Sequence, residues 1–243
     1  MRHLLVINPN TSDSVTGLLR THILQASGPD VAVHMATARF GARYISSEAS
    51  YAIAGHATLD AWAAWIADGG PMPDAVLIGC FGDPGLLALR ECSPVPVTGL
   101  AEAAFFEAAQ HGRFAIVTGG VAWKPMLQRL AHSLGYGDRL AHIHTVQATG
   151  AELAADPAAA RTLLAAACAE AAAQPGVQAV ILGGAGLAGM AAQIQHAVPV
   201  PVVDSVLAGA RQAQQWRSGT PGQVQLAGAW TGLSPALMQI ATI

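Results

Sequence analysis

Two segments of the chain are copies of one motif, but only one of them contains a thiol. They are residues 74–82 and 178–186, and when they are aligned Cys80 corresponds to Gly184. Each copy is an apolar run that ends in a glycine-rich turn, the pattern of a buried strand followed by a loop. A thiol in such a turn becomes a base or a nucleophile when a helix N-terminus lowers its pKa from about 8.5 towards neutrality. A small buried hydrophobe is the alternative for a lone cysteine. We predict that Cys80 is catalytic.

Short polar side chains follow two other predicted strands, residues 4–7 and 114–117. Together with loop N–H groups at helix N-termini, they could hold a carboxylate or an imide without a metal. Helix capping and turn formation explain Thr11 and Ser12 about as well as ligand binding does. The predicted substrate-binding residues are Asn10, Thr11, Phe81, Gly82, Thr118, Gly119, Gly184 and Ala185.

The remaining titratable residues give weaker signals. His142 and His144 lie two residues apart on one face of a predicted strand, but no third ligand is near in the sequence, so we predict no metal site. Lys124 is expected to be a solvated lysine in the first turn of a helix. We assign no role to His56, and we interpret the other two cysteines, Cys92 and Cys168, as packing residues.

A second motif points to a different class of enzyme. Gly184, Gly186 and Gly189 form a GxGxxG pattern after a predicted strand, and Asp204 follows roughly 20 residues later, where a dinucleotide fold places its ribose-binding acid. Too few residues follow Asp204 for the further strands of such a domain, and the first copy of the repeat lacks the pattern. An NAD-dependent oxidoreductase is therefore kept as a distant alternative.

Composition narrows the class of protein. The net charge is −3, and no basic cluster suggests nucleic acid or an anionic membrane as a partner. No apolar stretch approaches the length of about 18 residues that a membrane span needs, and the N-terminal run is too short for a signal peptide. Three cysteines with no regular spacing form neither a metal site nor a disulfide framework, so we expect a cytoplasmic protein. Charged residues are 11% of the 243, against about 25% on average, and we therefore expect a homo-oligomer that acts on a small molecule.

Predicted strands of four to six residues alternate with helical segments along the whole chain. This order favours an α/β fold with right-handed βαβ units and parallel sheets covered on both faces. The internal repeat divides the fold into two pseudo-symmetric, doubly wound, Rossmann-like lobes, with the active site in a cleft between them. We expect residues 1–97 with 203–243 to form the lobe that carries Cys80, and residues 98–202 to form the lobe that carries Gly184. Two strands are expected at residues 94–97 and 199–202.

Four segments together resemble a known superfamily: residues 8–12 (NPNTS), 79–86 (GCFGDPGL) and 116–118 (IVT), and the turn at Gly183. The chain resembles the aspartate/glutamate/hydantoin racemases, and among them the hydantoin and allantoin racemases most. The resemblance implies a two-lobed α/β enzyme that needs no cofactor. It also implies a pair of cysteines, one per lobe, that remove and return a proton on opposite faces of a carbon acid, and Cys80 matches the first of them.

The second cysteine of that pair is replaced by Gly184, which can neither accept nor donate a proton. Three interpretations follow. The chain is a racemase in which one cysteine and water suffice for an acidic carbon such as that of a 5-substituted hydantoin or allantoin. Alternatively, it is a single-cysteine decarboxylase or carbon–carbon lyase, which arylmalonate decarboxylases of the same superfamily resemble. In the third, Gly184 is an introduced replacement for a cysteine.

Overall fold

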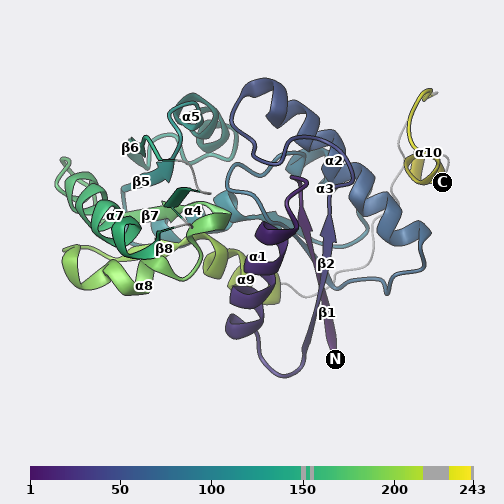
Figure 1. Ribbon diagram of the computed structural model, residues 1–243, viewed down its shortest axis with the longest axis horizontal. Helices are drawn as coiled ribbons and strands as arrows, with labels where there is room; N and C mark the ends of the chain where they lie inside the picture. The colour runs from purple at the N-terminus through teal and green to yellow at the C-terminus, as the bar shows by residue number, and fades with distance from the viewer. Residues whose placement is uncertain (149–151, 154–155, 216–229, 242–243) are drawn as a thin grey trace. The chain divides into compact units, whose positions relative to one another are not determined.

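The computed structural model describes residues 1–148, 152–153, 156–215 and 230–241, which form two compact units (Figure 1). The first unit consists of Met1–Gly79, Asp83–Gly99 and the described residues from Ala210 onward. The second consists of Cys80–Gly82 and the described residues of Leu100–Gly209. Each unit has its own parallel sheet of four strands, so the chain has the predicted α/β fold. The lobe boundaries expected from the sequence remain a prediction.

The sheet of the first unit has the strand order β2-β1-β3-β4. Figure 1 shows its first two strands side by side, and they pair in parallel along their whole length. The elements of this unit are β1 (Arg2–Asn8), α1 (Asp13–Ala26), β2 (Val31–Thr37), α2 (Glu48–Ala67), β3 (Ala75–Ile78), α3 (Leu86–Cys92), β4 (Val97–Gly99) and α10 (Pro235–Ala241).

The sheet of the second unit has the order β6-β5-β7-β8, which is the order of the first sheet when each unit is counted from its own first strand. This shared topology agrees with the internal repeat seen in the sequence. The elements are α4 (Leu100–Ala109), β5 (Phe114–Gly119), α5 (Trp123–Ser133), β6 (Leu140–Val146), α7 (Pro157–Ala172), β7 (Ala179–Gly183), α8 (Met190–Ile194), β8 (Val202–Asp204), α9 (Ser205–Gln215) and two short 3-10 helices, η1 (Ala185–Leu187) and η2 (Gln195–Ala197). The residues of α9 from Ala210 onward belong to the first unit.

The inner strands of both sheets are continuous apolar runs because helices cover both of their faces. Every residue of β3, β5 and β7 is buried, whereas the residues of the edge strand β2 are all half-buried. Long apolar runs therefore mark the centre of each sheet. The predicted site residues follow the carboxyl ends of β1, β3, β5 and β7. Well-packed strands therefore hold the start of each of these loops.

Two strands begin later than the sequence analysis predicted. The strands expected at residues 94–97 and 199–202 are β4 and β8, which begin at Val97 and Val202. Each predicted run contains two prolines, which have no N–H to donate to a ladder. The last proline of each run contributes only its carbonyl oxygen: Pro96 accepts from the N–H of Val76, and Pro201 accepts from that of Val180. Regular pairing starts after it.

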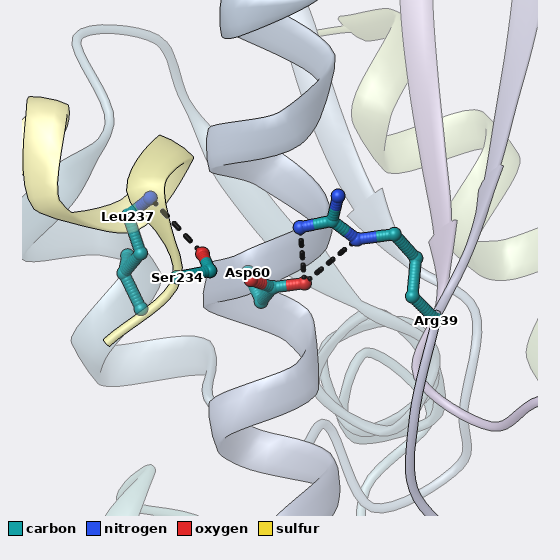
Figure 2. A network of polar contacts seen from close by, with 4 residues as sticks. All are labelled: Arg39, Asp60, Ser234 and Leu237. Atoms are coloured by element: carbon teal, nitrogen blue, oxygen red, sulfur yellow. Dashed lines mark hydrogen bonds and ion pairs between the residues drawn. The ribbon is translucent and has the colours of Figure 1, made fainter. Parts of the chain in front are cut away.

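Helix ends follow from short polar side chains. The Ser47 hydroxyl accepts the N–H of Ser50 at the start of α2, and Asp156 caps α7 just before Pro157, the proline predicted in its first turn. Figure 2 shows Ser234 accepting the N–H of Leu237 at the start of α10, a helix that contacts α2. No helix in the described part of the chain is long and apolar enough to cross a membrane.

Candidate functional site

Cys80 lies at the carboxyl end of β3, two residues after its last residue Ile78. It forms no disulfide bond, and its exposed fraction is 8%. Although β3 belongs to the first unit, Cys80, Phe81 and Gly82 group with the second. The turn that follows is tightly wound, with positive φ at Gly82 (141°) and Asp83 (51°). Among the described residues Asp83 is the one non-glycine residue with positive φ, a conformation that aspartate tolerates better than most residues.

Two aromatic rings fix the segment after Cys80. A Cβ added to Gly183 would lie 2.2 Å from Cε1 of Phe81, so the Phe81 ring sits directly on the end of β7. A Cβ added to Gly82 would lie 2.3 Å from Cζ3 of Trp123, the first residue of α5. These glycine contacts explain why Cys80–Gly82 group with the second unit. The Phe81 side chain is buried, and its predicted role in substrate binding stays a prediction.

The turn after β1 is a hydrogen-bonded network. The side chain of Asn8 donates to Oδ1 of Asn10 at 3.0 Å and to Thr16 at 3.0 Å, and the N–H of Ser12 donates to the same oxygen of Asn10 at 2.9 Å. The side-chain oxygen Oδ1 of Asn10 therefore accepts two hydrogen bonds that fix the turn. Within the described residues neither the Nδ2 of Asn10 nor the hydroxyl of Thr11 makes a hydrogen bond to the protein.

Thr118 lies at the carboxyl end of β5 and is nearly buried. It pairs in register with Gly183 of β7 on one side and with Thr145 of β6 on the other. Its hydroxyl makes no hydrogen bond to the described part of the chain. Because Thr118 lies opposite Gly183, its hydroxyl and the backbone of Gly119 lie near the turn that begins at Gly184.

Gly184 begins the loop after β7 with a backbone conformation, φ 147° and ψ 133°, that side chains rarely adopt. There is room for a Cβ, because its nearest neighbour would be Cγ of Leu187 at 3.4 Å. Glycine is therefore favoured at this position by its backbone dihedral angles and not by a lack of room for a side chain. The N–H of Gly184 donates to Oγ of Ser205 at 3.2 Å, so it is already engaged, whereas Ala185 is half-buried at the start of η1.

The carboxylate of Asp204 does not have the role that the dinucleotide motif predicts, which is to bind a ribose. Its Oδ2 accepts the N–H of Gly189 at 2.7 Å, and its Oδ1 accepts the N–H groups of Val206 and Leu207 at 2.9 and 3.1 Å. Both oxygens thus face the protein's own backbone rather than a ribose. The geometry removes the main support for the nicotinamide alternative.

His142 and His144 lie on the same strand, β6. The rings of His142 and His144 lie 6.5 Å apart, and His144 Nδ1 is 3.9 Å from a carboxylate oxygen of Glu170. Burial, then Lys124, then His144 lowers the pKa of His142. Across the described residues no group of three or more His, Cys, Asp or Glu gathers in a way that could hold a metal ion. His56 packs edge-on against Phe40.

Cys92 and Cys168 are packing residues, as predicted. Burial raises the pKa of the Cys168 thiol to about 12, and Cys168 lies inside the core that packs under β5 and β7. Burial and the nearby Glu91 raise the pKa of the Cys92 thiol. Both thiols are therefore held in their protonated, unreactive form.

The structure groups most of the predicted site residues in the second unit. Cys80, Phe81 and Gly82 reach the ends of β5 and β7 through the contact between Phe81 and Gly183, whereas Asn10 and Thr11 belong to the first unit. Sequence reasoning missed two contributors, Trp123 and Ser205. Nothing in the sequence marked them, because each acts through a contact with a residue far away in the chain.

Known proteins give an independent comparison. Residues 4–213 match the family model described as Asp/Glu/Hydantoin racemase. A hydantoin racemase of Paenarthrobacter aurescens is 33% identical over 87% of this chain and 89% of its own length. A hydantoin racemase of Pseudomonas sp. (strain NS671) is 30% identical over 86% of this chain and 83% of its own.

Solved structures agree with the sequence comparison. An allantoin racemase from Klebsiella pneumoniae superposes with a TM-score of 0.83 at 29% identity, covering 97% of this chain and 100% of that one. Arylmalonate decarboxylase superposes with a TM-score of 0.57 at 18% identity, which shows a shared fold alone. The chain therefore belongs to the Asp/Glu/hydantoin racemase family, and its relatives place it among the isomerases of the racemase type.

Proposed function

We propose that the protein is a cofactor-independent racemase or epimerase of a small carbon acid, such as a 5-substituted hydantoin or allantoin, with Cys80 as its acid and base. The observation that carries this proposal is the position of Cys80 at the carboxyl end of β3, one residue before Phe81, whose ring rests on the end of β7. Ligands in open α/β sheets bind at such strand ends. The hydantoin and allantoin racemases among the relatives suggest the substrate class.

Each side chain has a defined part in the proposed reaction. The Cys80 thiolate removes the proton from the carbon between the carbonyl and the ring nitrogen, and the resulting negative charge spreads onto the carbonyl oxygen. The hydroxyl of Thr118, which belongs to the same unit as Cys80, would hold a ring carbonyl, and loop N–H groups would add to it. The binding roles of Asn10 and Thr11 stay predictions from the sequence. The same thiol returns its proton to give the starting enantiomer. When water protonates the other face instead, the hydroxide that is left takes the proton from the thiol, and the thiolate is restored.

Gly184 supports a second candidate function. The backbone conformation at this residue favours glycine over any residue with a side chain, including the cysteine that the racemase pattern has there. An enzyme with one proton donor would deliver a proton to a single face of a carbanion. We therefore keep a single-cysteine decarboxylase or carbon–carbon lyase as the alternative.

Incubation in D2O with separate single enantiomers of 5-substituted hydantoins and allantoin, and with arylmalonates, separates the two candidates. For a racemase we expect deuterium at the stereocentre together with loss of optical rotation, above the rate without protein. Release of carbon dioxide from an arylmalonate with one enantiomer of product would instead establish the lyase. Unchanged substrates in every incubation would contradict both.

A further inference from the structure

The loop between β7 and α8 is hydrogen-bonded at both of its ends to two consecutive residues. At its start the N–H of Gly184 donates to Oγ of Ser205, and at its end the N–H of Gly189 donates to Oδ2 of Asp204. Ser205 is completely buried and Asp204 is 5% exposed. Water therefore competes little with these bonds, and a buried bond to a charged oxygen is among the stronger ones.

The topology explains why two neighbouring residues can reach both ends. β8 pairs with β7 in parallel, with Asp204 opposite Leu182, so the end of β8 lies beside the point where the chain leaves β7. The loop makes one 3-10 turn and returns to the same strand end, where Gly189, the residue before α8, has a positive φ of 78°. Asp204 is itself held by the first turn of α9 through two N–H groups.

We propose that Asp204 and Ser205 are positioning residues that hold the loop of residues 184–189 at its two ends. In this role they touch no reacting atom: Ser205 acts through its bond to Gly184, and Asp204 acts through its bond to Gly189. Their effect on turnover rests on the proposed function and on the prediction from the sequence that Gly184 and Ala185 bind the substrate. The anchoring of the loop is a separate property and has its own readout.

Two conservative variants release one end each. An asparagine has a single acceptor oxygen on its side chain, so Asp204→Asn cannot serve both the start of α9 and the N–H of Gly189. Ser205→Ala removes the acceptor of the Gly184 N–H. The matched control is Asp156→Asn, because Asp156 accepts the N–H groups of Ala158 and Ala159 at the start of α7 and bonds to no such loop.

Hydrogen exchange measured by mass spectrometry on the full-length proteins tests the anchoring. In Asp204→Asn and Ser205→Ala we expect the peptide that covers residues 184–190 to exchange faster by about tenfold or more, since each variant removes a buried bond. Asp156→Asn should leave that peptide unchanged. Exchange of this peptide at the wild-type rate in both site variants would overturn the proposal.

Steady-state kinetics test the positioning role. We expect KM for the racemised substrate to rise by roughly tenfold in the two site variants while kcat changes less, with no change in Asp156→Asn. Faster exchange without any change in KM or kcat would show that the loop does not position substrate. If the wild-type protein racemises none of the substrates, the proposed function has failed. In that case the exchange measurement still decides whether Asp204 and Ser205 hold the loop.

Discussion

The three thiols of the chain differ in the surroundings that decide their reactivity. Cys168 is fully buried in the core of the second unit, and its pKa is raised to about 12. Cys92 is also buried, and its thiol pKa is raised by burial and by Glu91. Cys80 alone follows an inner strand in a glycine-rich turn. These surroundings predict that the three thiols react at different rates, with Cys80 the fastest.

We expect iodoacetamide at pH 8 to alkylate Cys80 well before the other two cysteines. A thiol with a pKa of about 12 is ionised to roughly one part in ten thousand at that pH, and the thiolate is the species that reacts. Peptide mapping of the alkylated protein over time gives the order of labelling. Labelling of Cys168 as fast as Cys80 in the folded protein would contradict this assignment.

Part of the site could be predicted residue by residue. Cys80, Asn10, Thr11 and Thr118 follow apolar strands and carry their own chemical signal. The packing of Phe81 and the carboxylate bonds of Asp204 could not be predicted, because each depends on a backbone atom distant in the sequence. The sequence gives the chemical group that a side chain carries, whereas the tertiary structure decides which residue that group contacts.

At the level of elements, apolar run length was a good guide and proline was the main source of error. The inner strands were predicted at or close to their observed positions because buried parallel strands are continuous apolar runs. β4 and β8 begin late because the prolines before them cannot donate to the ladder. The loop after β7 keeps a glycine because its backbone conformation demands one.

Gly184→Ala tests that conformational demand. We expect the free energy of unfolding to fall by about 1–3 kcal/mol, because alanine is strained at a φ of 147° although a Cβ has room there. Gly17→Ala is the matched control: Gly17 is an exposed residue inside α1 whose added Cβ would meet nothing within 4 Å. That substitution should stabilise the protein by roughly 0.5–1 kcal/mol. Urea unfolding of both variants gives the values, and an equal effect of the two would be contrary to our account.

At the scale of the whole molecule, the two units share one strand order, which agrees with the duplication in the sequence. The cleft expected between two lobes remains a prediction. The surface composition suggests a further level of organisation. Charged residues are 11% of the chain, against about 25% in an average soluble protein. A chain with so few charged side chains is expected to cover part of its surface in a subunit interface.

We therefore expect a homo-oligomer in solution. Size-exclusion chromatography with light scattering should give a mass that is a multiple of the 24.8 kDa of one chain. The mass should not change on dilution over the micromolar range. A mass of 24.8 kDa at every concentration would rule out this expectation.

The central claim is that the sulfur of Cys80 moves a proton on and off carbon. Its most direct test is the rate of deuterium incorporation into one enantiomer of a racemised hydantoin in D2O, compared between wild type, Cys80→Ser and Cys92→Ala. We predict that Cys80→Ser lowers this rate by about 100-fold or more, because a serine hydroxyl is a far weaker acid, while Cys92→Ala retains it. Deuterium incorporation at the wild-type rate in Cys80→Ser would contradict the claim.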